Sequence, residues 1–235
     1  MKFQPYLFIL ISSAMFAQTK NKVKTYSIKK IEGQEILISG KGDSEQWKNA
    51  IEISDFTYPW EKETPPLTSF KAMHSKDWLY LLYNVKDENV QVLVKSNAKI
   101  EVIYSDRVEI FFRKDETMSP YYGLELDPHG RVYDYEATFH RQFNDQWTWP
   151  AGHLKVMAHL TKDGYAVEVA ISKESLKQLG LMKGNKLEAG LFRGNCIEMI
   201  EGKDSKIKWI SWVRPDSVTP NFHIPSAFGL LVLEE

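Results

Sequence analysis

The chain has 235 residues, and its 30 basic and 31 acidic side chains leave a net charge of −1 at neutral pH. This even balance creates no overall positive field of the kind that attracts nucleic acid or anionic lipid, so we expect neither as a partner. The single cysteine, Cys196, cannot form an internal disulfide, so packing must stabilise the fold. Aromatic residues make up 13% of the chain, more than we expect a core of this size to need, and some are therefore expected to contact a ligand.

The first residues have the pattern of a signal peptide. Lys2 precedes an apolar run from Tyr6 to Phe16, and the small residue Ala17 closes that run before a polar segment. We expect cleavage after Ala17, which gives a leader of residues 1–17 and one mature domain of residues 18–235. The apolar run is shorter than the roughly 20 residues that span a bilayer, so we expect no membrane helix after cleavage. The mature protein is expected in the periplasm, at the cell surface or in the medium.

Past the leader, short segments rich in β-branched and aromatic residues alternate with turn signals, which is typical of an all-β fold. One short helix is expected from Ser172 to Leu179, with Ser172 as its N-cap and Gly180 as its left-handed stop. The strands are numerous enough for a β-sandwich of two stacked antiparallel sheets. The predicted strands are Ser69–His74, Trp78–Val85, Val90–Lys95, Arg107–Arg113, Tyr121–Asp127, Val132–Thr138, Leu154–Leu160, Tyr165–Ile171, Leu187–Gly194, Lys208–Val213 and Phe228–Leu233.

Alternation along these strands separates an apolar face from a charged one, because successive side chains point to opposite faces. In Arg107–Arg113, the side chains of Arg107 and Glu109 share a face with a phenylalanine, opposite the apolar Ile110. Glu125 lies on the polar face of the following strand. Such a face suits a sugar, whose ring stacks on aromatic side chains while its hydroxyls bind charged groups. The alternative is an ordinary charged surface facing solvent.

The sequence lacks the motifs of several common catalytic centres. The sequence contains no HExxH or CxxC pair, no GxSxG elbow and no glycine-rich phosphate loop. Two carboxylate pairs, Glu109 with Glu125 and Asp134 with Glu136, could approach the spacing of about 5–10 Å that glycosidases use, which keeps a hydrolase open. No cofactor is required. Asp43 and Glu45 could bind a structural calcium ion, although a solvated turn explains them equally well.

Several motifs occur in an order that resembles the family 9 carbohydrate-binding modules, and most closely a branch of stand-alone exported proteins. The resemblance covers nearly the whole mature chain and implies a jelly-roll-like sandwich of two antiparallel sheets. The motifs are Ile38-Ser39-Gly40, Trp47-Lys48-Asn49-Ala50, Trp78-Leu79-Tyr80, Val85-Lys86-Asp87, the segment Asp106–Phe112, the segment Gly164–Ile171, Ile210-Ser211-Trp212 and the ending Asn221–Gly229.

The resemblance also implies a ligand site. In that family a sugar end is held between two rings, and charged residues bind its hydroxyls. The charged role carries over onto Glu109, and the ring positions fall at Ile103 or Tyr104 and at Phe222. Where the family has tryptophans, Tyr104 and Phe222 could still stack on a sugar ring.

Four further tryptophans bear on this site. Trp147 and Trp149 lie two residues apart, so an extended backbone would place both on one face, where they could add stacking surface. Trp209 and Trp212 lie three apart and should point to opposite faces of a strand, so one of them is expected to face outward. We expect Trp209 in the core, which leaves Trp212 as the candidate ligand contact.

The favoured function is non-catalytic binding of a glycan, either a polysaccharide or an oligosaccharide, by stacking and charged hydrogen bonds. One alternative is a glycoside hydrolase or another accessory protein of polysaccharide degradation. A second alternative is a haem-binding electron-transfer domain, because sandwiches of this general build also serve that role, although the sequence has no CxxCH attachment motif.

Overall fold

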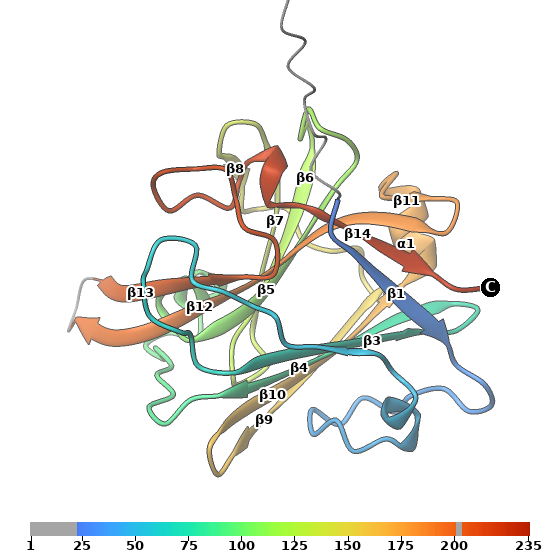
Figure 1. Cartoon of the computed structure of the whole chain (residues 1–235), viewed down its shortest axis with the longest axis horizontal. Coiled ribbons are helices and arrows are strands. Elements are labelled where there is room, and N and C mark those ends of the chain that lie inside the picture. Colours follow the sequence, from blue (N-terminus) through green and yellow to red (C-terminus); the bar gives the residue numbers. More distant parts are fainter. Residues whose placement is uncertain (1–22, 201–203) are drawn as a thin grey trace, which may run out of the picture.

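A computed structural model describes residues 23–200 and 204–235. The predicted leader, residues 1–17, lies outside these ranges. Most of the regular secondary structure of the described chain consists of strands (Figure 1). The strands are β1 (Thr25–Lys30), β2 (Glu52–Ile53), β3 (Thr68–His74), β4 (Trp78–Lys86), β5 (Arg107–Arg113), β6 (Tyr121–Leu126), β7 (Val132–Thr138), β8 (Gln142–Asn144), β9 (Leu154–Thr161), β10 (Gly164–Ser172), β11 (Met182–Lys183), β12 (Lys186–Ile200), β13 (Asp204–Ser211) and β14 (Gly229–Leu233). The helices are α1 (Lys173–Gln178) and the 3₁₀ turns η1 (Glu45–Lys48), η2 (Lys99–Tyr104) and η3 (Pro225–Ala227).

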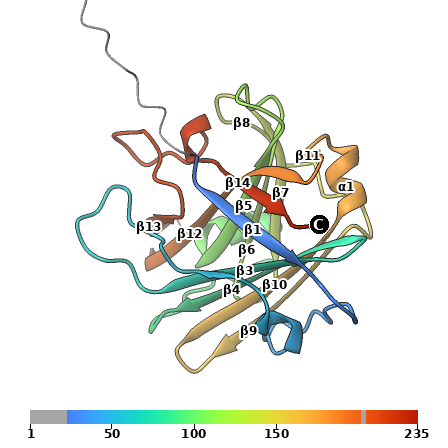
Figure 2. The same ribbon diagram turned by 45° about the vertical axis from the view of Figure 1, so that its right-hand side comes forward.

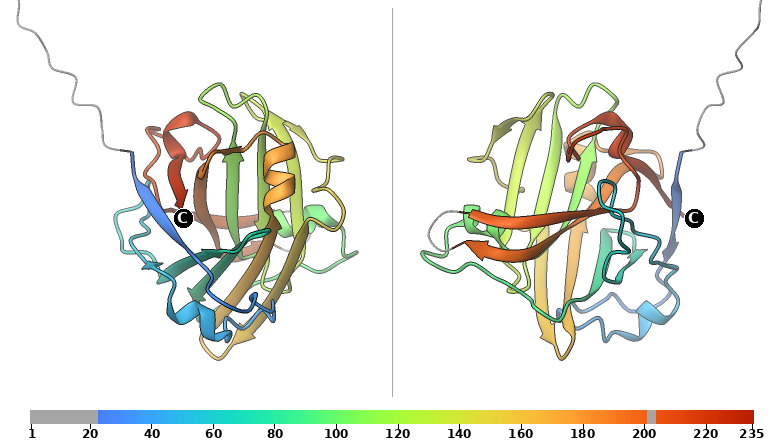
Figure 3. Two further views of the ribbon diagram at one scale, coloured as in Figure 1. Left: turned by 90° about the vertical axis from the view of Figure 1, so that its right-hand side faces the viewer. Right: turned by 60° about the vertical axis from the view of Figure 1, so that its left-hand side comes forward.

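The strands form two curled layers, which confirms the predicted β-sandwich. The first layer, called the β5 sheet, has the order β8-β7-β6-β5-β12-β14, and the second, called the β4 sheet, has the order β3-β4-β10-β9. Neighbours within each layer are antiparallel. The views in Figure 3 show the green strands of one layer apart from the teal and gold strands of the other.

Strand β1 joins the two layers and was not predicted. Its first residues pair in parallel with β14, and its last two residues pair in parallel with β3. Figure 2 shows β1 running diagonally from β14 toward β3. The sandwich is therefore one continuous sheet that folds over at β1, with two parallel pairings in an otherwise antiparallel structure.

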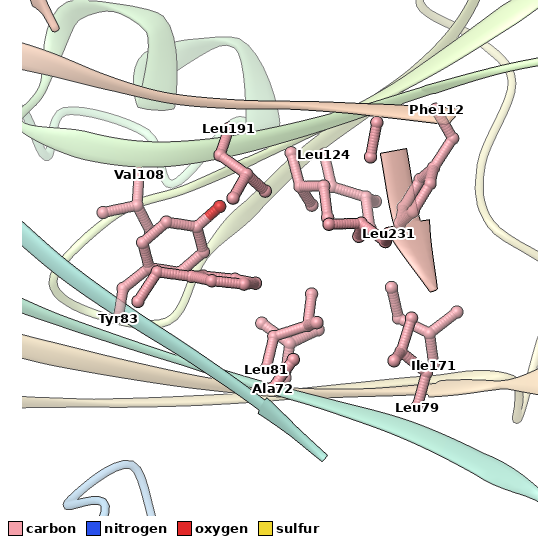
Figure 4. Packing of buried hydrophobic residues seen from close by; sticks show 14 of the residues in the cluster. Ala72, Leu79, Leu81, Tyr83, Val108, Phe112, Leu124, Ile171, Leu191 and Leu231 are labelled. Atoms are coloured by element: carbon pink, nitrogen blue, oxygen red, sulfur yellow. The ribbon is translucent and has the colours of Figure 1, made fainter. Parts of the chain in front are cut away.

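The main core lies between the layers and follows the predicted alternation. Val108, Ile110 and Phe112 of β5 point inward and are fully buried, as are Val169 and Ile171 of β10. Figure 4 shows side chains from both sheets meeting in this space. Burying each large apolar side chain contributes about 1.5–3 kcal/mol, so this cluster supplies the stability that no disulfide provides.

The predicted segment Val90–Lys95 is a loop and not a strand. Its backbone amides donate to side chains of the segment that follows, so they are not free to pair with a neighbouring strand. The backbone amide of Gln91 donates to Asp106 at 2.7 Å, and the amide of Leu93 donates to the Ser105 hydroxyl at 2.9 Å. Hydrophobic content alone predicted a strand here because it does not show where the backbone hydrogen bonds go.

The predicted helix is confirmed at both ends. The Ser172 hydroxyl accepts a hydrogen bond from the amide of Ser175, and Gly180 adopts a φ of +70° after the last turn. The Ser172 bond satisfies an amide that the first turn of the helix leaves free, and the left-handed conformation of Gly180 ends the helix.

Loops cover both outer faces of the sandwich. The N-terminal segment 36–50 packs on the β4 sheet, where Trp47 is buried. On the other side, Phe222, Ala227 and Phe228 pack against the outer face of the β5 sheet. All seven residues of β5 are consequently buried, so its charged face is not the solvent-exposed surface that the alternative reading of the sequence requires.

Candidate functional site

A pocket of about 80 Å³ opens on the outer face of the β5 sheet. Its floor comes from β5 and β6, one wall comes from β13, and the opposite wall comes from the segment before η3. The turn between β7 and β8 supplies its rim. The residues lining it are Arg107, Glu109, Glu125, Arg141, Trp209, Pro220, Asn221, Phe222 and His223.

The floor holds two carboxylates around one guanidinium. Glu109 and Glu125 are paired across β5 and β6, and Arg107 lies on the same face two residues before Glu109. The Nε of Arg107 donates to Glu125 Oε2 at 2.6 Å and lies 2.9 Å from Glu109 Oε1. Because Nε carries one hydrogen, it satisfies Glu125 and leaves Glu109 Oε1 buried without a hydrogen-bond donor.

This arrangement leaves one negative charge uncompensated, and the pKa values reflect it. Burial, followed by the neighbouring Glu125, raises the pKa of Glu109 to about 8. Burial also raises the pKa of Glu125, although Arg107 opposes the shift. The pair therefore retains one proton at neutral pH, and the geometry places it on Glu109, whose carboxyl lacks a donor.

Two strand glycines make room for this floor. A Cβ on Gly194 would lie 2.9 Å from Nη1 of Arg107, and a Cβ on Gly123 would lie 2.2 Å from the Tyr135 ring. Tyr135 is thereby able to lie flat over β6, and its buried hydroxyl has no hydrogen-bond partner among the described residues. The pocket region thus contains a second buried polar group that is not fully satisfied.

His223 closes one side of the pocket as a neutral side chain. Its Nδ1 lies 3.0 Å from the Tyr121 hydroxyl, and its ring stacks on Phe111 with centroids 5.1 Å apart. Burial, together with the positive charge of Arg141, lowers its pKa to about 3. It is therefore suited to hydrogen bonding and not to binding an anion by charge.

The aromatic side chains around the pocket differ in their exposure. Phe222 is buried between Phe192, at a centroid distance of 4.1 Å, and Trp209, at 5.6 Å. The guanidinium of Arg107 lies over the Trp209 ring, 5.0 Å from its centroid. Phe143 of β8 is 45% exposed and contacts His223 edge to face at 5.2 Å. Phe143 is therefore an exposed ring beside the pocket.

Comparison with known proteins agrees with this fold. The family described as carbohydrate family 9 binding domain-like matches residues 38–235. The chain belongs to this family. No curated protein shows significant similarity to it.

Solved structures of family 9 type have the same fold. A protein of Bacteroides uniformis whose proposed role is carbohydrate binding has a TM-score of 0.65 at 18% identity, over 91% of this chain and 100% of its own. A family 9 carbohydrate-binding module of Caldicellulosiruptor kristjanssonii in complex with cellotriose has a TM-score of 0.58 at 18% identity, over 90% of this chain and 94% of its own. Its complex with glucose gives a TM-score of 0.56 at 18% identity, over 90% and 96% of the two chains.

Within this family 9 fold, four of the predicted site residues come together and four do not. Arg107, Glu109, Glu125 and Phe222 all line the pocket. Tyr104 ends η2 and lines a different hollow, beside Glu101 and the β12–β13 hairpin. Of the ring positions carried over from the family, Phe222 therefore lines this pocket and Tyr104 does not.

The three predicted tryptophans pack in or against the main core. Trp149 is 4% exposed and donates from its indole to Ser175, while Trp147 lies edge to face against it at 5.7 Å. Trp212 is 3% exposed and belongs to the same core. The three tryptophans therefore do not line the pocket on the β5 sheet, and their role as ligand contacts stays a prediction. The amide of Trp149 donates to the Asp134 carboxylate at 2.6 Å, and both rings contact Tyr122, so the two side chains lie together on the core side of this segment.

The sequence reasoning missed several residues of the pocket. Trp209 and Trp212 do point to opposite sides, but Trp209 is the one that faces outward. Asn221 and His223 flank the predicted Phe222, so the same motif could have indicated them. Arg141 had no signal, because a lone arginine in a turn is ordinary in sequence.

The predicted calcium site is untested. Asp43 accepts a hydrogen bond from the Ser39 hydroxyl at 2.7 Å, as in a solvated turn. In the described parts of the chain, no three His, Cys, Asp or Glu side chains gather closely enough to share a metal ion.

The described parts of the chain also contain no helix long and apolar enough to span a bilayer.

Proposed function

We propose that this family 9 protein binds a saccharide without catalysing its cleavage, and that one sugar residue enters the pocket on the β5 sheet. The observation that carries the proposal is the combination of a polar floor, formed by Arg107, Glu109 and Glu125, with aromatic walls in the same pocket. Sugar rings need both kinds of contact, because their faces are apolar and their edges carry hydroxyls.

The size of the pocket supports entry by the edge of a ring. A volume of about 80 Å³ is room for several water molecules, since each needs roughly 10–15 Å³. The hydroxyl-bearing edge of one sugar fits such a space, while the rest of the ring stays outside. Phe143 then offers an exposed face on which the outer part of the saccharide can stack.

The family relatives support a saccharide as the ligand class. The Caldicellulosiruptor kristjanssonii module was solved with cellotriose and with glucose. We extend to this chain only the class of ligand, because the two chains share 18% identity.

The position of the carboxylates favours binding over hydrolysis. Glycosidases place two acids about 5–10 Å apart on either side of the scissile bond. Glu109 and Glu125 instead both contact Nε of Arg107, at 2.9 and 2.6 Å, so the guanidinium occupies the space between them. Asp134, from the other candidate pair, accepts hydrogen bonds from Thr148, Trp149 and Lys99.

Calorimetric titration of the purified protein against a panel of oligosaccharides tests the proposal. Glu109→Leu removes both oxygens of the floor carboxyl but keeps the Arg107–Glu125 pair, so the fold should persist and the affinity should fall. Losing such hydrogen bonds costs about 1–3 kcal/mol, or roughly 5- to 150-fold in affinity. The matched control is Glu174→Leu on the exposed side of α1.

Two outcomes would contradict the proposal. If Glu109→Leu bound saccharide as tightly as the parent, the pocket would not be the site. If the parent released reducing ends from a polysaccharide and Glu109→Leu did not, the protein would be a glycoside hydrolase.

Phe143→Ala should reduce the affinity for the saccharide because it removes the stacking surface, which is worth about 0.5–1.5 kcal/mol.

A further inference from the structure

The charges around the pocket do not balance once the shared proton is counted. On the floor, the Arg107 guanidinium is paired with the Glu125 carboxylate at 2.6 Å. Glu109 lies beside the same guanidinium without a hydrogen-bond donor and holds its proton at neutral pH. His223 is neutral. The floor and this wall therefore carry no net charge, and any net charge of the pocket must come from its rim.

The rim carries one cation, Arg141. It lies in the turn between β7 and β8, it is exposed, and its side chain lines the pocket. Among residues 23–200 and 204–235, no carboxylate lies within 4 Å of its guanidinium. Its charge acts on His223, where it opposes protonation, and on the Tyr121 hydroxyl. The positive field of Arg141 therefore extends into the pocket.

We propose that the saccharide bound in this pocket carries a negative charge, from a uronic acid carboxylate or a sulfate ester, and that Arg141 pairs with that group. This inference rests on the proposed saccharide-binding function. A planar guanidinium binds carboxylate and sulfate oxygens with two parallel hydrogen bonds between opposite charges, and an uncharged sugar edge carries no such charge. A neutral sugar would leave the cation at the rim unpaired.

The expected preference is moderate because Arg141 is exposed. Ion pairs in contact with solvent contribute little and are screened by salt, so the acid should bind about two- to tenfold better than a neutral analogue.

The test compares two ligands that differ only in charge. A galacturonic acid trisaccharide and its methyl ester are titrated calorimetrically against the parent, Arg141→Gln and the control Lys177→Gln, which removes an exposed cation on α1. A sulfated galactan oligosaccharide and its desulfated form make a second pair that distinguishes sulfate from carboxylate. Each titration is repeated at low salt and at about 0.5 M salt, where the Debye length is only a few ångströms.

The parent and Lys177→Gln should prefer the charged member of at least one pair two- to tenfold, more strongly at low salt. In Arg141→Gln the ratio of the two affinities should fall to about one. Equal affinity for both members of each pair in the parent, a preference that survives Arg141→Gln, or binding of neutral saccharides alone would overturn the inference and leave the proposed function standing. Failure of every saccharide to bind, or binding that survives Glu109→Leu, would overturn the proposed function itself.

Discussion

Glu109 and Glu125 face each other across β5 and β6 and share a single buried cation, the guanidinium of Arg107. Two buried carboxylates with one guanidinium cannot both ionise without a large desolvation cost. The cluster therefore retains a proton at neutral pH, and the stability of the domain should depend on pH partly through this place in the β5 sheet.

The free energy of unfolding should fall as pH rises from about 6.5 to 8; below that range the neutral His223, whose pKa is lowered to about 3, gives a slope of the opposite sign. The pKa of Glu109 is raised from 4.5 to about 8 by burial and by Glu125, so the native chain keeps a proton that the unfolded chain has lost. Burial and the nearby Asp87 raise the pKa of Asp106 to about 7, which adds to the same trend. Urea unfolding at pH 6.5 and pH 8, where the histidines no longer contribute, should show a loss of about 2 kcal/mol.

Glu109→Gln should flatten this dependence, because the amide resembles the protonated carboxyl and cannot ionise. The control Glu174→Gln, on the exposed side of α1, should keep the slope of the parent. A slope that is equally steep in Glu109→Gln would show that the proton is held elsewhere. The same variant should retain saccharide affinity near neutral pH, in contrast to Glu109→Leu.

Alternation was enough to predict which face of β5 carries Arg107 and Glu109, since the period of a strand is two. It could not predict that this face is buried, because the covering side chains of Phe222 and Phe228 follow more than 100 residues later in the chain. Burial of the charged face creates the pocket, and burial depends on contacts between segments far apart in sequence.

The tryptophans show what residue spacing can predict and what it cannot. Spacing correctly placed Trp209 and Trp212 on opposite sides, but it could not tell which side is the core. For Trp147 and Trp149, spacing could not tell that the side they share faces the core, where both rings contact Tyr122. The Asp134 carboxylate binds the amide of Trp149 at 2.6 Å and helps to hold the segment there. Side-chain to backbone bonds of this kind leave no periodic signal in a sequence.

Gly123→Ala should destabilise the domain, although alanine normally stabilises the interior of a strand relative to glycine. The added Cβ would lie 2.2 Å from Cζ of Tyr135, so the ring must move. We expect a loss of about 1–3 kcal/mol by urea unfolding. The double variant Gly123→Ala/Tyr135→Leu should show less than the sum of the two single losses. Additive losses would mean that the contact with Tyr135 is not the cause.

Glu168→Gln should also be costly, despite its small change in shape. The fully buried Glu168 carboxylate accepts hydrogen bonds from the amides of Ser39 and Gly40, at 2.8 and 2.6 Å, and from the Trp47 indole at 2.8 Å. An amide nitrogen in place of one oxygen would face a donor. We expect a loss of about 2–3 kcal/mol and faster hydrogen exchange in residues 36–50, with Glu174→Gln as the silent control. Unchanged exchange would show that Glu168 does not anchor this segment.

Export should remove the leader after Ala17, the small residue that closes the apolar run. N-terminal sequencing of the protein from its native host should begin at Gln18. Retention of Met1, or a start more than a few residues from Gln18, would contradict the assignment of residues 1–17 as a signal peptide.

Tyr83→Phe should cost more than its single lost oxygen suggests, because that oxygen links the two sheets. The Tyr83 side chain extends from β4 across the core, and its hydroxyl donates to the backbone carbonyl of Glu109 at 2.9 Å (Figure 4). Removing the hydroxyl leaves a buried acceptor short of a partner, at about 1–3 kcal/mol by urea unfolding. The matched control is Tyr80→Phe on the same strand, whose hydroxyl binds Glu35 at the partly exposed outer face, so its loss should stay below about 1 kcal/mol. If both variants lost the same stability, the bond between the sheets would contribute no more than one at the surface.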